Sequence, residues 1–168
     1  MIKYEYFKNV EKDAIFTEEK CQFCGSQNNC LEGVYFERPN LKSVCLSCFQ
    51  KKVIAVDIPQ YLRIRVHDNI EKINKLGFTP PVPWVQYNDW QVCCDDFMQY
   101  QGEWTQEDFI RESNDGNGIE YFKSLLDEDF IKQINDIDIL FNDLGDDTVA
   151  FVFSCRVCNK KKVVCQSY

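Results

Sequence analysis

Cysteine is the residue type with the most chemistry to offer in this sequence, which contains ten of them. Six form three Cys-x-x-Cys pairs, and the first two pairs are Cys21/Cys24 and Cys45/Cys48. A Cys-x-x-Cys turn directs two sulfurs toward a common point, and two turns supply the four soft thiolates of a tetrahedral zinc site. Since 20 residues separate these pairs, a spacing typical of zinc ribbons, they predict a closed structural zinc site.

The third pair, Cys155/Cys158, predicts a second zinc site whose remaining ligands must come from elsewhere in the chain. The adjacent residues Cys93 and Cys94 are the preferred partners, although neighbouring side chains point apart unless the backbone is distorted. Cys165 or a carboxylate such as that of Asp96 are alternatives for completing the site. The preferred ligands of the second site are Cys93, Cys94, Cys155 and Cys158.

Other roles for the thiols and for the single histidine remain alternatives. A Cys-x-x-Cys pair can be a redox dithiol, but that motif needs one pair in a βαβ context. The cysteines of the second cluster can also be buried thiols that behave as small apolar residues. Cys30 has no spacing partner and is expected to be a free thiol in a polar loop. His67 stands alone, which leaves no histidine-based catalytic arrangement.

The composition describes a folded protein of moderate size. The chain has 168 residues, of which 45% are hydrophobic and 27% charged, with a formal net charge of −8. This balance argues against disorder, and the negative charge disfavours ordinary nucleic-acid binding. Residues 1–8 contain no continuous apolar segment and no stretch reaches the length of a membrane span. Ten cysteines without an export signal therefore predict a cytoplasmic protein whose thiols are kept for metal binding.

Hydrophobic spacing and turn residues predict the elements that position the cysteines. In the N-terminal half, we expect a strand over 4–10, paired strands over 33–36 and 42–44, a short helix over 50–56, and a helix over 69–76 capped by Gly77.

In the C-terminal half, an aromatic loop over 84–90 follows three prolines. Thr105 and Asp108 are typical of the start of a helix. Apolar residues that recur about every 3.6 residues predict amphipathic helix over 118–142, either as one helix or as two, with the second beginning near Asp127. Strands are expected over 148–153 and 163–165.

These elements predict an α+β fold in which zinc-ribbon or treble-clef-like knuckles and short antiparallel strands pack with an acidic helical layer. We expect a single domain over 1–168. Its submodules are a first zinc module at 15–60, a second zinc module made of 84–102 plus 148–168, and an acidic helical segment at 103–147.

The order of these motifs resembles the CbrC family, small bacterial proteins of largely uncharacterised function named in connection with tolerance of a nuclease colicin. The early Cys-x-x-Cys-Gly, the second Cys-x-x-Cys, a Thr-Pro…Trp-Gln…Trp stretch at 79–90 and the final Phe-x-Cys-x-x-Cys at 153–158 carry the resemblance. Cys93 stands where the family has His, and Met98 stands where it has a second Cys. The resemblance supports pairing Cys94 with the last knuckle, with Cys93 in place of the missing thiol.

The acidic charge is concentrated in one segment. Residues 103–147 contain 14 acidic and 3 basic residues, a net of −11, whereas the rest of the chain carries +3. A solvated helix face is one interpretation, and a surface complementary to a basic protein is the other. In the second interpretation, the contacts to the partner are made by Glu120, Asp127, Glu128, Asp129, Asp136, Asp138, Asp143, Trp84 and Trp90.

The sequence thus favours a non-enzymatic, cytoplasmic zinc protein that acts by binding another protein. The expected role is that of an immunity or tolerance protein against a bacterial toxin such as a basic nuclease domain. One alternative is a zinc-dependent hydrolase or thiol oxidoreductase that uses the second cysteine cluster. Another is a zinc-ribbon protein that binds nucleic acid through the basic turn at 160–162.

Overall fold

The computed structural model describes residues 3–168, so the first two residues of the N-terminal segment considered above lie outside it. The chain forms two compact units. Unit 1 contains the residues up to Pro83 together with Asp95–Phe97, and unit 2 contains Trp84–Cys94 and Met98–Tyr168. Within the described residues, no helix has the length and apolarity needed to cross a membrane.

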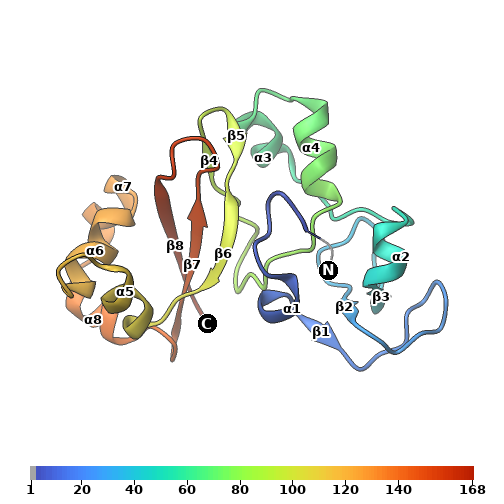
Figure 1. Cartoon of the computed structure of the whole chain (residues 1–168), viewed down its shortest axis with the longest axis horizontal. Helices are drawn as coiled ribbons and strands as arrows, with labels where there is room; N and C mark the ends of the chain where they lie inside the picture. Colours follow the sequence, from blue (N-terminus) through green and yellow to red (C-terminus); the bar gives the residue numbers. More distant parts are fainter. Residues whose placement is uncertain (1–2) are drawn as a thin grey trace. The chain divides into compact units, whose positions relative to one another are not determined.

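Unit 1 combines short strands with short helices (Figure 1). Its elements are α1 (Val10–Asp13), β1 (Phe16–Thr17), β2 (Cys30–Glu32), β3 (Ser43–Cys45), α2 (Leu46–Gln50), α3 (Gln60–Arg65), α4 (Ile70–Gly77) and β5 (Asp96–Phe97). The strands β1, β2 and β3 form an antiparallel sheet in that order. With strands of two or three residues, this sheet has little hydrogen bonding of its own, so other interactions must stabilise the unit.

The β2–β3 hairpin depends on Gly33. A Cβ at this position would lie 1.9 Å from the carbonyl oxygen of Leu41. Only glycine therefore permits the two backbone segments of the hairpin to approach so closely. The sequence prediction placed the first strand over 33–36, whereas the strand is Cys30–Glu32. Phe36 instead makes an isolated bridge with Val56.

Helix α4 confirms the prediction for residues 69–76. Asn69 is the N-cap, and its side chain accepts a hydrogen bond from the Lys72 N–H. Ile73 and Leu76 are buried as expected, but Ile70 is 64% exposed and does not belong to the buried face. Gly77 is the last helical residue, not the cap.

Unit 2 is a three-stranded antiparallel sheet with a layer of short helices (Figure 1). Its elements are β4 (Val92–Cys93), β6 (Gln99–Glu103), α5 (Gln106–Glu112), α6 (Gly118–Leu125), α7 (Glu128–Gln133), α8 (Ile137–Asn142), β7 (Thr148–Ser154) and β8 (Lys161–Ser167). The sheet order is β6-β7-β8, with Phe151 opposite Val164 and Ser154 opposite Lys161. Both predicted C-terminal strands are confirmed.

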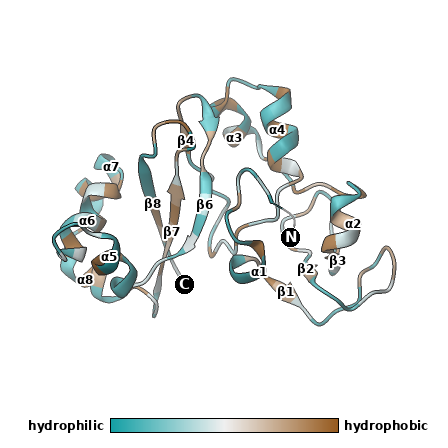
Figure 2. Ribbon diagram, in the orientation of Figure 1, coloured by the Kyte–Doolittle hydropathy of each residue, from teal (hydrophilic) through white to brown (hydrophobic). Residues whose placement is uncertain are grey.

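Strand β7 is the centre of unit 2, and Figure 2 shows it as a strongly hydrophobic strand. Because side chains alternate between the faces of a strand, Ala150 and Val152 pack with the helices while Phe151 and Phe153 point to the other face. The helical face is covered by Phe109, Phe122 and Phe141, whose rings contact one another.

The aromatic loop at 84–90 covers the opposite face of the sheet. Trp84 stacks on Phe153 with ring centroids 5.9 Å apart, and Trp90 lies edge-on to the same ring at 5.6 Å. The buried Gln166 side chain fixes this loop by accepting hydrogen bonds from the Val85 and Gln86 N–H groups. The two tryptophans are thus core residues, at 6% and 2% exposure, and the prediction that they anchor a partner is wrong.

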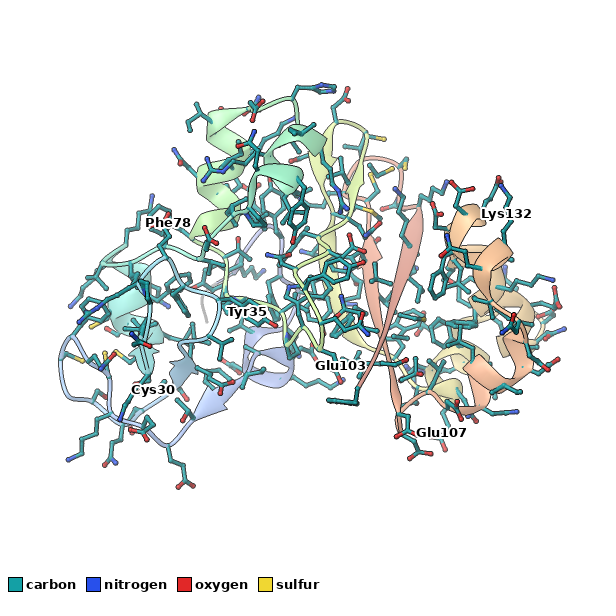
Figure 3. The ribbon with its side chains drawn as sticks, turned by 180° about the vertical axis from the view of Figure 1, so that it is seen from behind. Cys30, Tyr35, Phe78, Glu103, Glu107 and Lys132 are labelled. Carbon is teal, nitrogen blue, oxygen red and sulfur yellow. The ribbon has the colours of Figure 1, made fainter. Side chains whose placement is uncertain are left out.

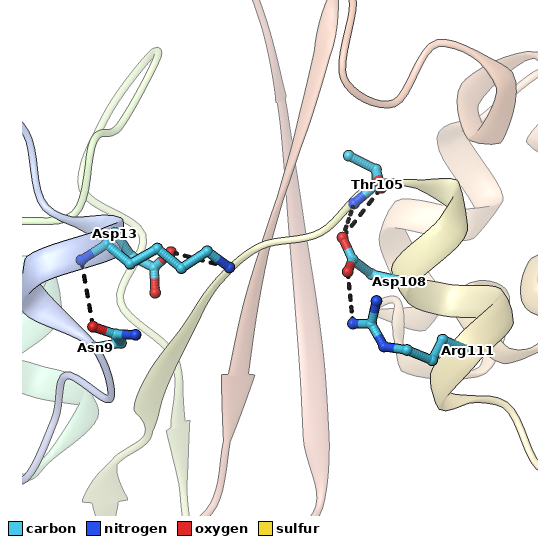
Figure 4. Close-up of polar contacts among 6 residues, drawn as sticks. Asn9, Asp13, Thr105, Asp108 and Arg111 are labelled. Atoms are coloured by element: carbon cyan, nitrogen blue, oxygen red, sulfur yellow. Dashed lines mark hydrogen bonds and ion pairs between the residues drawn. The ribbon is translucent and has the colours of Figure 1, made fainter.

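Capping residues explain the number of helices in the acidic segment. Thr105 and Asp108 form the predicted capping box, in which the Asp108 carboxylate accepts from the Thr105 N–H at 2.8 Å (Figure 4). Asp127 and Asp136 are the N-caps of α7 and α8, and the side chain of each accepts hydrogen bonds from the backbone N–H groups two and three residues later. The segment 118–142 therefore contains three helices instead of one or two. Glu107 and Lys132 extend from this layer into solvent (Figure 3).

Two other sequence predictions about unit 1 need correction. Residues 4–10 form no strand, and α1 begins at Val10. Tyr6 and Phe7 are adjacent and both buried, whereas adjacent side chains of a strand point to opposite faces. The prediction of a short helix over 50–56 is wrong: α2 lies earlier, over Leu46–Gln50, and residues 51–56 form no helix.

Candidate metal centres

The structure groups eight cysteines into two sets of four. Each set has four sulfur atoms that all lie within 4.8 Å of one another. Tetrad 1, in unit 1, consists of Cys21, Cys24, Cys45 and Cys48. Tetrad 2, in unit 2, consists of Cys93, Cys94, Cys155 and Cys158. Both sets are positioned to hold a metal ion.

The first pair of tetrad 1 and the last pair of tetrad 2 have the same backbone conformation. The Gly25 N–H donates to the Cys21 carbonyl at 2.8 Å, and the Asn159 N–H donates to the Cys155 carbonyl at 3.0 Å. The two residues have left-handed φ values of 74° and 61°, respectively. In both turns the N–H of the first cysteine donates to a carbonyl five residues later, at 2.8 Å. Two unrelated segments therefore form the same two-sulfur knuckle.

The other half of tetrad 1 lies at a strand-to-helix junction. Cys45 is the last residue of β3 and the N-cap of α2, and its sulfur accepts a hydrogen bond from the Cys48 N–H at 3.4 Å. Cys48 lies in the first turn of the helix, so both sulfurs face the knuckle. The Cys45 sulfur is 3.6 Å from that of Cys24.

The other half of tetrad 2 comes from two adjacent residues. Cys93 ends β4, and Cys94 and Asp95 have left-handed φ values of 52° and 59°. Such values are uncommon outside glycine and distort the backbone at this point. The Cys93 sulfur lies 3.8 Å from that of Cys94 and 3.6 Å from that of Cys158. The backbone distortion that two adjacent cysteines need in order to join one cluster is thus present.

The sulfur distances match a four-coordinate site. A zinc–sulfur bond of about 2.3 Å places the sulfurs of a regular tetrahedron about 3.8 Å apart. One sulfur pair of tetrad 1, at 3.6 Å, and two pairs of tetrad 2, at 3.6 and 3.8 Å, are close to this value, and the other pairs lie within 4.8 Å. A cation at the centre of either tetrad would therefore contact four sulfurs without large rearrangement of the chain.

The electrostatics of each tetrad favour a single negative sulfur in the absence of a cation. Desolvation raises the pKa of Cys21, but hydrogen bonds from the backbone of Cys45, Phe23 and Cys24 outweigh it and lower this pKa to about 6. Desolvation, reinforced by the neighbouring sulfurs, raises the pKa of Cys48 to about 12. Since four close thiols resist ionising together, a bound cation is needed to hold four thiolates.

Tetrad 2 has the same division of charge. Desolvation opposes ionisation of Cys155, but backbone hydrogen bonds from Cys158 and Val157 outweigh it and lower its pKa to about 6. Hydrogen bonding to the Cys158 and Cys93 sulfurs raises the pKa of Cys94 to about 12. Each knuckle thus stabilises its first cysteine as a thiolate, which is the form that binds a metal.

The remaining candidates lie outside the two clusters. Cys30 is not in a loop but is buried in β2, and its sulfur donates to the Ser26 carbonyl at 3.2 Å. Cys165 packs against the helical layer, and burial raises its pKa to about 12. The Asp96 carboxylate accepts a hydrogen bond from the Tyr6 hydroxyl at 2.6 Å, and Met98 is fully buried. His67 is exposed, with its Nε2 3.6 Å from Asp95.

The acidic residues predicted to contact a partner are all exposed, and some have local roles. Asp127 and Asp136 accept backbone hydrogen bonds as helix N-caps, and Asp129 forms an ion pair with Lys132 at 2.9 Å. The others, which lie on or beside the same helices, are Glu120, Glu128, Asp138 and Asp143.

Comparison with protein families identifies what the chain is related to. A family model described as an uncharacterised protein family, UPF0167, matches residues 1–166. The chain belongs to this family. The match covers nearly the whole sequence and agrees with the resemblance to an uncharacterised CbrC-type family. No curated protein and no solved structure matches the chain.

Proposed function

We propose that the chain binds two zinc ions, one in each tetrad, and that it acts by binding a basic protein partner instead of catalysing a reaction. The observation that carries the first part is the convergence of four cysteine sulfurs in each unit. Four thiolates in tetrahedral arrangement are the ligand set of structural zinc sites, and they leave no open position for water or substrate. This closed ligand set supports a structural role over the hydrolase alternative.

In this proposal, tetrad 1 is a treble-clef-like centre. The order knuckle, antiparallel hairpin and helix, with Cys45 and Cys48 at the helix start, supports it. Zinc would link the knuckle to the hairpin and the helix, and its binding free energy would contribute directly to folding. Zinc supplies this cross-link and no redox chemistry of its own.

The metal part of the proposal is tested by zinc-edge X-ray absorption of the purified chain. We expect only sulfur neighbours, about four per zinc at about 2.3 Å. A spectrum with oxygen or nitrogen neighbours would mean an open or mixed site and would contradict the closed structural role. Iron in place of zinc would overturn the choice of metal.

The partner-binding part rests on the charge of unit 2. Unit 1 has 12 acidic and 12 basic residues, whereas unit 2 has 15 acidic and 7 basic residues and so carries the whole net charge of −8. Exposed side chains such as Glu128 and Asp138 contribute to this charge. A nuclease toxin holds phosphates with Lys and Arg, so an acidic protein can cover its active surface. We therefore propose an immunity or tolerance role in the cytoplasm.

This role is tested with a basic colicin-type nuclease domain, whose cleavage of DNA is measured with and without an equimolar amount of the chain. We expect inhibition that weakens as salt is added. The variant Glu128→Gln/Asp138→Asn should inhibit less than the control Glu18→Gln/Glu19→Gln, which removes equal charge from exposed residues of unit 1. Equal inhibition by both variants, or no inhibition at all, would refute the role.

A further inference from the structure

The two tetrads differ in how exposed their cysteine residues are. In tetrad 1, Cys21, Cys45 and Cys48 are buried and only Cys24 is exposed. In tetrad 2, only Cys155 is buried, Cys93 is half-buried, and Cys94 and Cys158 are exposed. Displacement of a metal proceeds by attack on one ligand after another. A reagent can therefore reach three ligands of tetrad 2 but only one of tetrad 1.

Basic residues lie beside tetrad 2. Arg156 is inside the knuckle, and Lys160 and Lys161 follow it after Asn159. The Lys162 Nζ donates to the Val92 carbonyl at 2.7 Å, one residue before Cys93. Tetrad 2 is therefore the more accessible cluster, and it lies in a basic part of the chain.

The fold of unit 2 does not depend on this cluster. The strands β7 and β8 pair over seven residues, and the hydrophobic core on the helical face contains no tetrad residue. The knuckle lies in the turn between these strands, beyond Ser154. Loss of a metal from tetrad 2 would therefore free the turn and leave the sheet folded. Tetrad 1, by contrast, joins strands of only two or three residues.

We propose that tetrad 2 is a peroxide-reactive thiol site that releases its metal on oxidation, while tetrad 1 keeps its metal. The proposal rests on the zinc binding proposed above. The exposed Cys158 thiolate attacks a peroxide O–O bond, which gives a sulfenic acid and, after protonation, one water. The Cys93 thiolate, 3.6 Å away, then attacks that sulfur and expels a second water after protonation. Two thiolates, one hydrogen peroxide and two protons thus give one disulfide and two waters.

Cys93 is a better resolving thiol for Cys158 than for its neighbour. A disulfide between Cys93 and Cys94 would close a strained ring of adjacent residues, whereas one to Cys158 joins separate segments. The two thiolates that remain, Cys94 and Cys155, are too few to hold zinc in a tetrahedral site. The disulfide would keep the knuckle tied to β4 after the metal has left. A thiol reductant would reverse the reaction by attacking one of the two disulfide sulfurs.

The test follows zinc release from the purified, zinc-loaded chain with a chromophoric chelator while hydrogen peroxide is added. Native mass spectrometry counts the zinc that remains, and peptide mapping locates the disulfide. We expect the zinc of tetrad 2 to leave roughly tenfold faster than that of tetrad 1. This ratio corresponds to about 1.4 kcal/mol, the free energy needed to expose the buried cysteines of tetrad 1 by local opening. The new disulfide should join Cys93 to Cys158. The control Cys165→Ser, which changes a thiol outside both tetrads, should release zinc at the same rate.

Release of both metals at one rate, or earlier oxidation of Cys24 and Cys45, would overturn the proposal. Absence of zinc in the starting protein would instead refute the proposed metal binding. In that case, the peptide map still compares the rates at which Cys158 and Cys24 are oxidised. Equal rates there would overturn the reactivity difference as well.

Discussion

Gly25 offers a quantitative test of whether knuckle conformation and metal binding are coupled. Its φ of 74° lies in the left-handed region, and a Cβ at this position would meet no atom within 4 Å. The substitution Gly25→Ala therefore adds backbone strain without a steric clash. That strain is about 1 to 2 kcal/mol for a non-glycine residue. It should arise only when the knuckle is formed, since the free chain can relax to negative φ.

If zinc binding requires the knuckle, the strain must appear as weaker binding at tetrad 1. A loss of 1 to 2 kcal/mol corresponds to an affinity reduced roughly 5- to 30-fold. Competition with a chromophoric chelator measures this affinity for each site. Tetrad 2 in the same variant should be unaffected and serves as the internal reference.

Gly116 provides a matched control. It has a φ of 76° and the same open surroundings, but it lies in the turn between α5 and α6 and belongs to neither cysteine knuckle. Gly116→Ala should lower the stability of unit 2 without changing the zinc affinity of tetrad 1. An unchanged affinity in Gly25→Ala, or an equal loss in both variants, would show that knuckle strain is not coupled to the metal.

Three further predictions concern unit 2. Gly118→Ala should destabilise unit 2 by about 1 to 3 kcal/mol, measured by thermal denaturation. The added Cβ would lie 2.6 Å from the Ile110 Cγ1 and 2.9 Å from the Ile110 backbone nitrogen. An unchanged transition would contradict the close packing of α5 on α6. Desolvation of Asp108 is outweighed by hydrogen bonds from Thr105 and Arg111, which lower its pKa. The ionised Asp108 carboxylate should therefore stabilise the fold above the unfolded pKa of about 3.9, and this stabilisation should disappear as the pH falls through the lower folded pKa. Asp108→Asn should lower the free energy of unfolding by about 0.5 to 2 kcal/mol near neutral pH and leave it unchanged in strong acid. A pH-independent difference in urea denaturation would be inconsistent with this origin. Burial, which raises the pKa of Cys165 to about 12, should keep this thiol unalkylated by iodoacetamide in the native state and reactive after unfolding; rapid native labelling found by mass spectrometry would refute its burial.

The metal clusters could be anticipated from the sequence because ligand spacing is a local property. The spacing of Cys21/Cys24 and Cys45/Cys48 already required a common centre. Spacing alone could not assign Cys93 to tetrad 2, because its place there depends on left-handed φ values at Cys94 and Asp95. No local rule predicts such values for these residue types, so spacing left Cys165 as an alternative.

The helical layer was predictable in composition but not in its breaks. Apolar residues recur with helical spacing from Ile119 to Leu144, and this spacing continues across the gaps between α6, α7 and α8. Asp136 is the N-cap of α8, but an aspartate inside a periodic pattern reads equally well as an exposed helical residue. The sequence therefore located the layer and missed its third helix.

The tryptophans were misplaced because burial is a tertiary property. Trp84 and Trp90 follow a proline-rich segment, and their residue types suit both a binding surface and a core. Both tryptophans pack on Phe153, which lies on one face of β7. The alternation of residues within β7 does not show which other segment of the chain covers that face. The acidic surface thus remains the feature of unit 2 on which partner binding is proposed.

The number of zinc ions per chain tests the central claim most directly. Native mass spectrometry of the purified protein should find two zinc ions. The variants Cys45→Ser/Cys48→Ser and Cys155→Ser/Cys158→Ser should each retain one, because each removes two ligands from one tetrad. Absence of zinc from the wild-type chain, or two zinc ions in either variant, would contradict the assignment of the tetrads as metal centres.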